Sequence, residues 1–577
     1  MKKTIHSPRR LPAALGLLLG IVFLAGCQTT DATVETVTCP AETTVSVETT
    51  AATEPTQTTA PPPEFTPEKT ASGDPANWGV TWEVIQGEAV LTEYLREEEI
   101  TFGDPEEYFA LPGIATFRGN NYRNGATYGT AEVVDEEFSR SWQVDTGELG
   151  SASGVPWAGS GWTGQPLIVK WDEETKQIMN LREEKKQKED LVEVIYATLD
   201  GRIYFLDLED GSYTRDPLYI GMSFKGAGSL DPRGYPLMYV GSGDVNAYGQ
   251  RPRMYVISLI DTSVLYEYGS EETMQLRTDH DSWCAFDSAP LVHGDTDTLI
   301  WPGENGILYT IRLNTRYDKA AGTISVSPET PVGFRYDTER SGSDDYWYGF
   351  EASASIVDNY LYVSENGGMF YCIDLNTMDL VWAQDTRDDS NSSPVFERVS
   401  EEQGYIYTAP SLHWTAGSRS WGEISVYKLD AITGEIIWET PFEVSTIDGV
   451  SGGVQATGLL GKAGTSIEGM IIYPIARYGA MYSGAVVALD TDTGEVLWQV
   501  DTQLYSWSSP VAIYTDDGRA YVVVGDAEGI MRLIDGATGE VLDTISIYSI
   551  VEASPAVYEN TLVVGTRGYM IHCLTID

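Results

Sequence analysis

Residues 489–502 read LDTDTGEVLWQVDT and show the unit from which much of the chain is built. An apolar residue meets an Asp, a tight turn follows at Thr-Gly-Glu, and the next strand carries a Trp. The Asp side chain can accept hydrogen bonds from turn amides, and Gly adopts a positive φ without steric cost. The stretch therefore predicts two antiparallel strands joined by a tight turn.

Copies of this unit recur along the chain. They read LDAITGEIIW at 429–438, IDGATGEVLD at 534–543, IDLNTMDLVW at 373–382 and, more weakly, LDLEDGSYT at 206–214. The alternate acids of DTDTGE suggest a Ca²⁺ loop, but the Gly falls one place early for an EF-hand and the distal Glu is missing. We therefore interpret these segments as structural turns.

A second mark precedes each copy. It reads SSPV at 508, ASPAV at 553, SSPVF at 392, SAPLV at 288 and SASIV at 353, with looser versions GQPLIV at 164, GSL at 228 and SGGVQ at 451. Between each opening and its turn lies a strand with a Gly-rich end, such as AYVVVGDAEG at 520–529. Eight units of about four short strands are typical of a β-propeller.

The combined pattern, SSP…YVG…LD…TGE…W, resembles the PQQ-like β-propeller repeat. That family includes quinoprotein alcohol dehydrogenases and the non-catalytic, BamB-like envelope lipoproteins. FRGNNYRNG at 117–125 is similar to the segment that often precedes the first blade in such proteins. The resemblance spans residues 117–577 and implies an all-β fold, an eight-bladed propeller of four-stranded blades over 138–577. It also implies that the strand-ending tryptophans pack between blades: Trp142, Trp382, Trp438 and Trp498.

The pentapeptide WQVDT occurs twice, at 498–502 and at 142–146. The later copy follows its own turn and is the fourth strand of its unit. The earlier copy follows no turn and stands before the first opening, whereas the last unit ends at MIHCLTID (570–577) without a fourth strand. We therefore expect the strand around Trp142 to complete the last blade and close the ring, which removes edge strands that invite aggregation.

The N-terminus carries basic residues, an apolar run over 11–23, and LAGC at 24–27. The run is too short and wrongly flanked to span a membrane and is typical of an export signal. LAGC resembles the lipobox of bacterial lipoproteins, which implies that residues 1–26 are removed and that Cys27 is lipidated. We therefore expect an extracytoplasmic protein anchored to a membrane by this lipid.

Two further segments lie between the signal and the propeller. Residues 27–77 are rich in Thr, Glu, Ala and Pro, which predicts a disordered tether because such a segment has little apolar surface to bury. Residues 78–137 contain some strand alternation, in EVIQGEAV, and are expected to pack on the propeller. The long tether favours the outer face of a Gram-positive type of cell membrane, since BamB-like proteins need no such stalk.

The chain has 86 acidic and 36 basic side chains and a formal net charge of −50. Such a surface repels phosphates, which argues against nucleic acid as a partner. Solubility in an exposed compartment explains the charge, and attraction of cations or basic partners is the alternative.

The catalytic branch of the family implies an adjacent Cys pair against the quinone and a Ca²⁺ held by Glu, Asn and Asp. The five cysteines here are not neighbours: Cys27, Cys39, Cys284, Cys372 and Cys573. Cys372 and Cys573 fall in opposite blades, too far apart for a disulfide, and are interpreted as buried thiols. We therefore expect no cofactor, no metal and no catalytic residue, with PQQ and Ca²⁺ as the alternative.

The loops that enter the innermost strands of a propeller meet around its axis. Aromatic and acidic residues in these loops form a candidate ligand rim: Trp162, Trp283, Asp287, Tyr348, Trp507 and Glu552. Such a rim can stack a sugar or hold a peptide, but aromatic side chains more often pack inside the protein. The sequence favours a non-catalytic scaffold that binds an unknown envelope protein, peptide or glycan. The alternatives are a degenerate PQQ-dependent quinoprotein dehydrogenase and a carbohydrate-binding surface protein.

Overall fold

The computed structural model describes residues 65–161, 164–269, 271–277, 285–340, 348–413, 420–447 and 451–577. The chain divides into two units, residues 1–61 and 62–577, and every described residue belongs to the second. Within the described residues, no helix has the length and apolarity that crossing a membrane requires.

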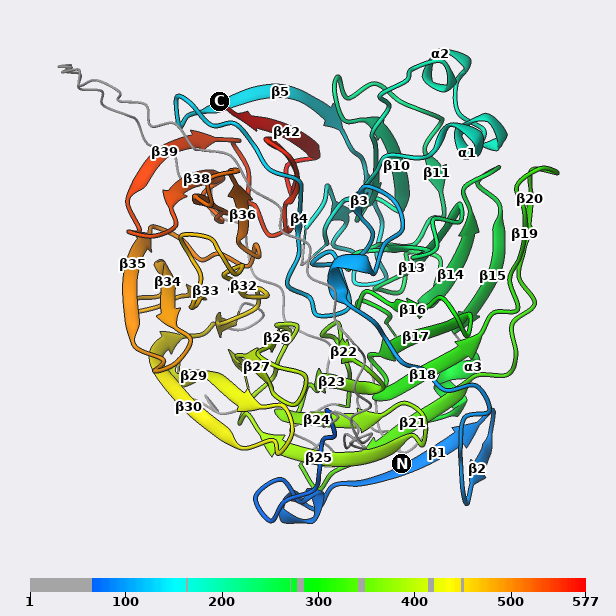
Figure 1. The fold of residues 1–577 in the computed structure, drawn as a ribbon, viewed down its shortest axis with the longest axis vertical. Helices are drawn as coiled ribbons and strands as arrows, with labels where there is room; N and C mark the ends of the chain where they lie inside the picture. Colours follow the sequence, from blue (N-terminus) through cyan, green and yellow to red (C-terminus); the bar gives the residue numbers. More distant parts are fainter. Residues whose placement is uncertain are drawn as a thin grey trace, which may run out of the picture. The chain divides into compact units, whose positions relative to one another are not determined.

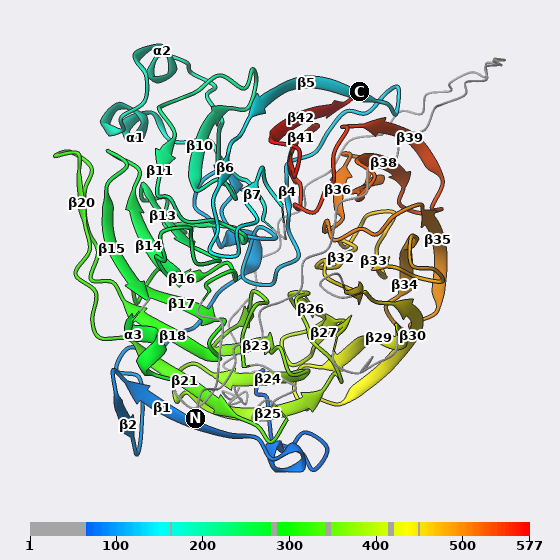
Figure 2. The ribbon, with the colours of Figure 1, turned by 180° about the vertical axis from the view of Figure 1, so that it is seen from behind.

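The described residues form eight sheets of at least four strands, set radially around an axis in chain order (Figures 1 and 2). Their arrangement confirms the predicted eight-bladed propeller. From the axis outward, the strands of blades 1 to 4 are β8 (Leu167–Val169), β9 (Glu193–Ala197), β10 (Arg202–Asp207), β11 (Leu218–Tyr219); β12 (Ser229–Leu230), β13 (Leu237–Gly241), β14 (Arg253–Ser258), β15 (Val264–Gly269); β16 (Leu291–His293), β17 (Thr298–Gly303), β18 (Ile307–Arg312), β21 (Val332–Asp337); and β22 (Ser355–Val357), β23 (Tyr360–Ser364), β24 (Met369–Asp374), β25 (Asp379–Asp385).

The strands of blades 5 to 8, in the same order, are β26 (Val395–Arg398), β27 (Gly404–Thr408), β29 (Trp421–Asp430), β30 (Ile436–Ser445); β32 (Leu459–Leu460), β33 (Met470–Ala476), β34 (Gly484–Asp490), β35 (Val496–Thr502); β36 (Val511–Tyr514), β37 (Ala520–Gly525), β38 (Ile530–Asp535), β39 (Val541–Ser546); and β40 (Ala556–Tyr558), β41 (Thr561–Thr566), β42 (Met570–Ile576), β5 (Phe138–Asp145). Short pieces outside this scheme are β6 (Glu148–Leu149), β7 (Trp157–Ala158), α3 (Glu271–Gln275), β19 (Arg316–Asp318), β20 (Thr323–Ser325), β28 (Ser411–Leu412) and β31 (Gly452–Gly453).

Blade 8 is completed from the other end of the ring, as the repeated pentapeptide predicts. Strand β5 pairs antiparallel with β42, with Trp142 opposite Cys573 and Gln143 opposite His572. Figure 1 shows β5 beside β42 at the C-terminus. The N-terminal strand therefore closes the ring.

The recurrent Trp and the Gly of the turn pack against each other across blades. A Cβ on Gly494, in the turn of blade 6, would lie 2.7 Å from the ring of Trp438 in blade 5. The ring Nε1 of Trp438 donates to the carbonyl of Thr491, at 3.0 Å. The same pairing joins Trp382 to Gly434, Trp498 to Gly539, and Trp142 to Gly211. The expected inter-blade packing of the tryptophans is confirmed. It gives a second reason for Gly in the turn: besides the positive φ, the neighbouring Trp ring leaves no room for a Cβ.

The recurrent Ser of the openings also joins neighbouring blades. Its hydroxyl, or that of Thr457, accepts a hydrogen bond from the matching amide of the previous blade, at 2.8–3.2 Å. In chain order, the amide donors are those of Ala289, Ser353, Ser393, Thr457 and Ser509. Their hydroxyl acceptors are those of Ser353, Ser393, Thr457, Ser509 and Ser554. These bonds bring the openings of blades 3 to 8 together around the axis.

The segment before β5 follows the ring rather than forming a core of its own. It contains η1 (Pro75–Trp78), β1 (Thr81–Gln86), β2 (Ala89–Leu91), η2 (Pro105–Glu107), β3 (Gly113–Ile114) and β4 (Thr127–Tyr128). Strand β1 extends blade 3 by pairing with β21, β3 pairs with β8, and β4 pairs with β40. Figure 1 shows this segment on the near face of the ring.

The packed chain begins before the predicted end of the tether at residue 77. The ring of Phe65 is 2% exposed and lies edge-on to Phe396, with centroids 5.8 Å apart. The amide of Glu68 donates to the carbonyl of Ile432. The chain from Phe65 onward, which the predicted tether includes, therefore packs against the propeller, with Phe65 as its apolar anchor.

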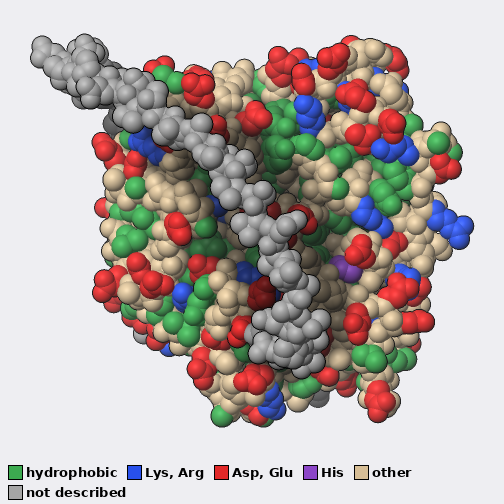
Figure 3. Space-filling view, viewed as in Figure 1, with side chains coloured by type: hydrophobic (Ala, Val, Ile, Leu, Met, Phe, Trp, Pro, Cys, Tyr) green, Lys and Arg blue, Asp and Glu red, His purple; other side chains and the backbone are tan. Residues whose placement is uncertain are grey.

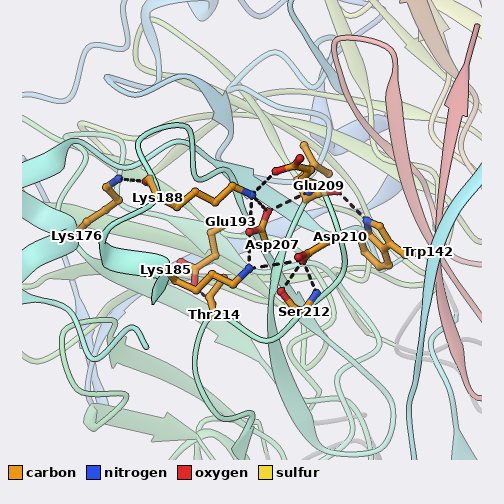
Figure 4. A network of polar contacts seen from close by, with 11 residues as sticks. Trp142, Lys176, Lys185, Lys188, Glu193, Asp207, Glu209, Asp210, Ser212 and Thr214 are labelled. Atoms are coloured by element: carbon orange, nitrogen blue, oxygen red, sulfur yellow. Dashed lines mark hydrogen bonds and ion pairs between the residues drawn. The ribbon is translucent and has the colours of Figure 1, made fainter. Parts of the chain in front are cut away.

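The charged insertion of blade 1, at 170–190, forms α1 (Glu173–Ile178) and α2 (Glu183–Lys186) between β8 and β9. Lys185 of this insertion is buried, and its ammonium lies 2.6 Å from the buried Asp207 carboxylate. Lys188 lies equally close to Asp207 (Figure 4). The insertion is therefore held to the blade by ion pairs whose lysine stems are covered.

The two described cysteines pack inside blades. Cys372 lies in β24 of blade 4 and Cys573 in β42 of blade 8, and both are buried free thiols. Burial raises the pKa of both thiols. The interpretation of these two residues as buried thiols is confirmed, whereas Cys27, Cys39 and Cys284 lie outside the described residues.

Candidate binding site around the ring axis

The site is built from two sets of loops that meet at one end of the ring. One set enters the innermost strands and the other joins the second strand of each blade to the third. Figure 2 shows this end, with the β6–β7 hairpin on the near side. The opposite end, seen in Figure 3, has Asp and Glu side chains spread over its surface, as the net charge predicts.

Three carboxylates meet in the loops of blades 3 and 4. One oxygen each from Asp287, Glu304 and Glu351 lie within 4.8 Å of one another. Asp287 is 4% exposed and Glu304 is 5% exposed. Burial raises the pKa of Glu304 well above its ordinary value, and the charges of Glu351 and Asp287 add to this rise. Three acids this close are stable only when protons or cations offset their repulsion.

One lysine supplies part of that charge. The ammonium of Lys225, from the opening of blade 2, lies 3.3 Å from the Asp287 carboxylate. Burial lowers the pKa of Lys225, but Asp287, Glu304, Glu351 and Asp244 together more than offset this effect, so its pKa is raised. Neither oxygen of Asp287 nor Oε2 of Glu304 makes a hydrogen bond within the described part of the chain. The cluster therefore has more negative charge than Lys225 alone can balance.

The acidic cluster continues towards blade 5. Asp389 is buried, and its carboxylate lies 3.4 Å from Nδ1 of His413. Burial raises the pKa of Asp389. Burial lowers the pKa of His413, but Asp389, Asp388 and Glu351 together raise it above its ordinary value. We call Lys225, Asp287, Glu304, Glu351, Asp389 and His413 the acidic arc.

Tyr505, Trp507, Glu552, Arg567 and Trp157, from blades 7, 8 and 1, form a second arc, which we call the aromatic arc. The rings of Tyr505 and Trp507 have centroids 4.9 Å apart, and the Tyr505 hydroxyl donates to Glu552 at 3.1 Å. Arg567 lies 3.9 Å from Glu552 and over the ring of Trp157. Since Lys225 also lies over Trp157, at 5.4 Å, the two arcs meet there.

The predicted rim is only partly visible in this geometry. Trp162 and Trp283 lie outside the described residues. Tyr348 is fully buried, with its hydroxyl donating to Asp337 and Arg277 over its ring, and Trp507 is 6% exposed. The structure brings Trp507 and Glu552 together and places Asp287 in the acidic arc.

Sequence reasoning did not single out Lys225 or Glu304. Glu304 directly follows WPG, the Gly-ended second strand of blade 3, and every such end lies in the same set of loops. Glu304 could have been predicted from this position in the repeat. Lys225 stands three residues before the loose GSL opening and had no comparable mark.

The residues fit a divalent cation better than they fit the quinone. Ca²⁺ prefers carboxylate oxygens, and the acidic arc offers three within one ion's reach. The quinone site that the family resemblance implies requires adjacent cysteines, and the sequence has none. The only described cysteines lie inside blades 4 and 8, as given above.

Comparison with known proteins supports the same architecture. The family model described as outer membrane protein assembly factor BamB matches residues 399–549 and 482–577. Outer membrane protein assembly factor BamB of Kangiella koreensis is 25% identical over 209 residues, 36% of this chain and 46% of that protein. Quinohemoprotein alcohol dehydrogenase of Comamonas testosteroni is 28% identical over 159 residues, 26% of this chain and 20% of that protein. The chain thus spans less than half the length of these curated relatives.

Solved structures share the fold at low identity. Quinohemoprotein alcohol dehydrogenase ADHIIG from Pseudomonas putida HK5 superposes with a TM-score of 0.53 at 12% identity, over 83% of each chain. The enzyme of the same name from Comamonas testosteroni gives 0.52 at 12% identity, over 82% of each chain. The solved structures show the fold alone, whereas the family match over residues 399–577, with the eight closed blades and their recurrent Ser, Gly and Trp contacts, supports a PQQ-like β-propeller.

Proposed function

We propose that this protein is a non-catalytic binding propeller of the cell envelope, held to the outer face of a membrane by a lipid on Cys27. It presents the loops of the acidic arc to a cation or to a cationic group of its partner. The BamB relative supports an envelope role, because its name describes an assembly factor. The lipobox-like LAGC and the polar segment behind it support the anchor.

The observation that carries the binding role is the convergence of Asp287, Glu304 and Glu351, of which Asp287 and Glu304 are buried. Their carboxylates lie within 4.8 Å of one another, and the Lys225 ammonium lies beside Asp287. Burying carboxylates without hydrogen bonds costs free energy that a bound cation recovers. The cluster is therefore preorganised for a positive ligand, and Ca²⁺ is the simplest probe of it.

Calcium titration of the purified protein tests this role. Isothermal titration calorimetry should detect one Ca²⁺ site in the wild type and lose it in Glu304→Gln, which keeps the shape of the side chain. Glu552→Gln is the matched control, because Glu552 lies in the aromatic arc and pairs with Tyr505 and Arg567. Equal heats for wild type and Glu304→Gln would exclude the acidic arc as the cation site.

The quinoprotein dehydrogenase is the second candidate, favoured by the same carboxylates and by the Comamonas relative. Adding PQQ with Ca²⁺ and assaying dye-linked alcohol oxidation separates the two functions. We expect no turnover above the background of Glu304→Gln, because no Cys pair is present to contact a quinone. Robust wild-type turnover would overturn the non-catalytic role.

The aromatic arc gives less support to carbohydrate binding. Stacking on a sugar requires an open aromatic face, and the described rim aromatics Tyr348 and Trp507 are buried. A partner protein is therefore the favoured occupant. Cross-linking the anchored protein in its own membrane should yield a partner that is lost in Glu304→Gln, whereas Cys27→Ser should release the protein from the membrane fraction.

A further inference from the structure

Two buried arginines, Arg118 and Arg123, lie near the ring axis in the segment FRGNNYRNG at 117–125. Arg118 is fully buried. Its backbone amide donates to Oε1 of Gln165 in the opening of blade 1, and its Nη2 donates to the carbonyl of Gly458 in blade 6, each at 3.2 Å. The side chain thus reaches across the axis between two distant blades.

The guanidinium of Arg118 is under-satisfied. Neither Nε nor Nη1 has a hydrogen-bond partner among the described residues, and no described carboxylate forms an ion pair with the guanidinium. Burial lowers the pKa of Arg118 to about 10, so the group stays protonated at neutral pH. A buried cation without a counter-charge costs several kcal/mol in general, because its hydration is lost.

The surroundings of Arg118 offer donors. A Cβ on Gly458 would lie 2.6 Å from Cζ of Tyr473, so the phenol lies against the residue that Arg118 contacts. Burial raises the pKa of Tyr473, whereas Arg118 and the Ser392 hydroxyl act to lower it. The hydroxyls of Tyr473 and Ser392 are buried, and neither makes a well-formed hydrogen bond to a described residue. Arginine and two hydroxyl groups can all donate to one acceptor.

Arg123, in the same segment, is a second arginine at this axis, and each nitrogen of its guanidinium has a hydrogen-bond acceptor. It is also fully buried, but its Nε donates to Ala354 and its Nη2 to Ala289, each carbonyl at 2.8 Å. Its Nη1 donates to Thr116 and Phe117. Three backbone carbonyls and the Thr116 hydroxyl therefore give every nitrogen of the Arg123 guanidinium an acceptor, whereas two nitrogens of Arg118 have none among the described residues.

We propose that a small inorganic anion, of the size and charge of chloride, binds beside Arg118 and the hydroxyls of Tyr473 and Ser392. The anion supplies the missing counter-charge and accepts the open hydrogen bonds. It ties the segment before the first blade to blades 5 and 6, at a place distinct from the cation site of the acidic arc. A water molecule could accept some of these bonds, but it would leave the positive charge uncompensated.

Anomalous scattering locates the anion directly. Crystals of the wild-type protein grown with sodium bromide should show one buried bromide peak in contact with Arg118 and with the Tyr473 or Ser392 hydroxyl. Ordered water without an anomalous peak at this place would overturn the proposal. This measurement needs no variant and is therefore independent of any effect on folding.

Stability measurements test the same site in solution. At constant ionic strength, replacing a bulky organic anion by chloride should raise the unfolding temperature of the wild type with the logarithm of chloride concentration, because a ligand stabilises the state that binds it. Arg118→Gln should lose this dependence. Arg123→Gln is the matched control and should be less stable but keep the chloride dependence.

A milder variant guards against failure to fold. Tyr473→Phe removes only one hydroxyl, and it should weaken chloride binding several-fold while the protein remains folded. Identical chloride dependence in wild type, Tyr473→Phe and Arg118→Gln would overturn the anion site.

Discussion

Trp142 of β5 lies directly opposite Cys573 of β42, so that the first propeller strand in the chain forms the outer edge of the last blade. Its ring Nε1 donates to the carbonyl of Leu208 in blade 1, at 2.8 Å. The ring also faces Gly211, where a Cβ would approach it to 2.7 Å. Trp142 therefore joins the blade that it completes to the blade that begins the ring.

Trp142→Ala should lower the free energy of unfolding by about 3 kcal/mol, because it removes a large packed ring from the closure. Urea-induced unfolding followed by circular dichroism measures this change. Trp421→Ala is the control, since Trp421 is 44% exposed and an exposed substitution changes stability by about 0.5 kcal/mol or less. Equal, small effects of both substitutions would show that closure does not depend on this residue.

Gly494→Ala should destabilise the propeller more than Gly479→Ala. Both glycines have a positive φ, +73° and +69°, so the backbone cost of a Cβ is similar. Only Gly494 faces a tryptophan, whereas a Cβ on Gly479 would meet nothing within 4 Å. Overpacking against Trp438 should add about 1–3 kcal/mol. Thermal unfolding of the two variants gives the comparison, and equal melting temperatures would contradict the role of the Gly–Trp contact.

The repeated features could be predicted because each makes the same contact in several blades. The Gly of T-G-E meets a Trp, and the Ser of the openings accepts a neighbouring amide, so the contacts recur in the sequence. The site has no such periodicity. Lys225 and Glu304 come from different kinds of loop in neighbouring blades, and the packing of blade 2 against blade 3 brings them together. One sequence contains no signal for that pairing.

The sequence also does not indicate which charged side chains are buried. Residues 170–190 look like a solvated excursion because charged side chains dominate them. The aliphatic part of Lys185 is nevertheless buried, and its ammonium forms an ion pair with Asp207, which is 1% exposed. The Asp that begins each turn usually binds turn amides, and in blade 1 it also binds two lysines.

Asp207→Asn should lower the free energy of unfolding by about 3–5 kcal/mol, because it leaves the ammonium groups of Lys185 and Lys188 without a buried counter-charge. Asp190→Asn is the matched control. Asp190 pairs with Lys170 at 2.9 Å, but its side chain is 88% exposed, so its loss should not measurably change stability. Urea unfolding of both variants at neutral pH provides the measurement. A stable Asp207→Asn protein would mean that the insertion is held by its apolar contacts alone.

His572 should make the protein less stable as the pH falls below neutral. The imidazole is 4% exposed, its Nε2 has no hydrogen-bond partner among the described residues, and burial lowers its pKa from 6.5 to about 4, with Arg140 adding to the effect. Below pH 6.5 the unfolded chain binds a proton at this histidine, whereas the folded chain binds it only near pH 4. The free energy of unfolding therefore declines between these values, by about 3 kcal/mol in full.

Replacing His572 removes its contribution to the loss of stability at low pH. His572→Gln should unfold with a shallower loss of stability between pH 6.5 and 4, measured from urea midpoints at several pH values. His413→Gln is the contrasting variant, because Asp389 holds the pKa of His413 above its ordinary value. Its stabilisation is present below pH 6.5 and is lost as the pH rises through that higher value, so this variant should change the profile above pH 6.5. A His572→Gln profile parallel to that of the wild type between pH 6.5 and 4 would show that the folded protein already accommodates the charged imidazole, through a rearrangement of β42 against β5.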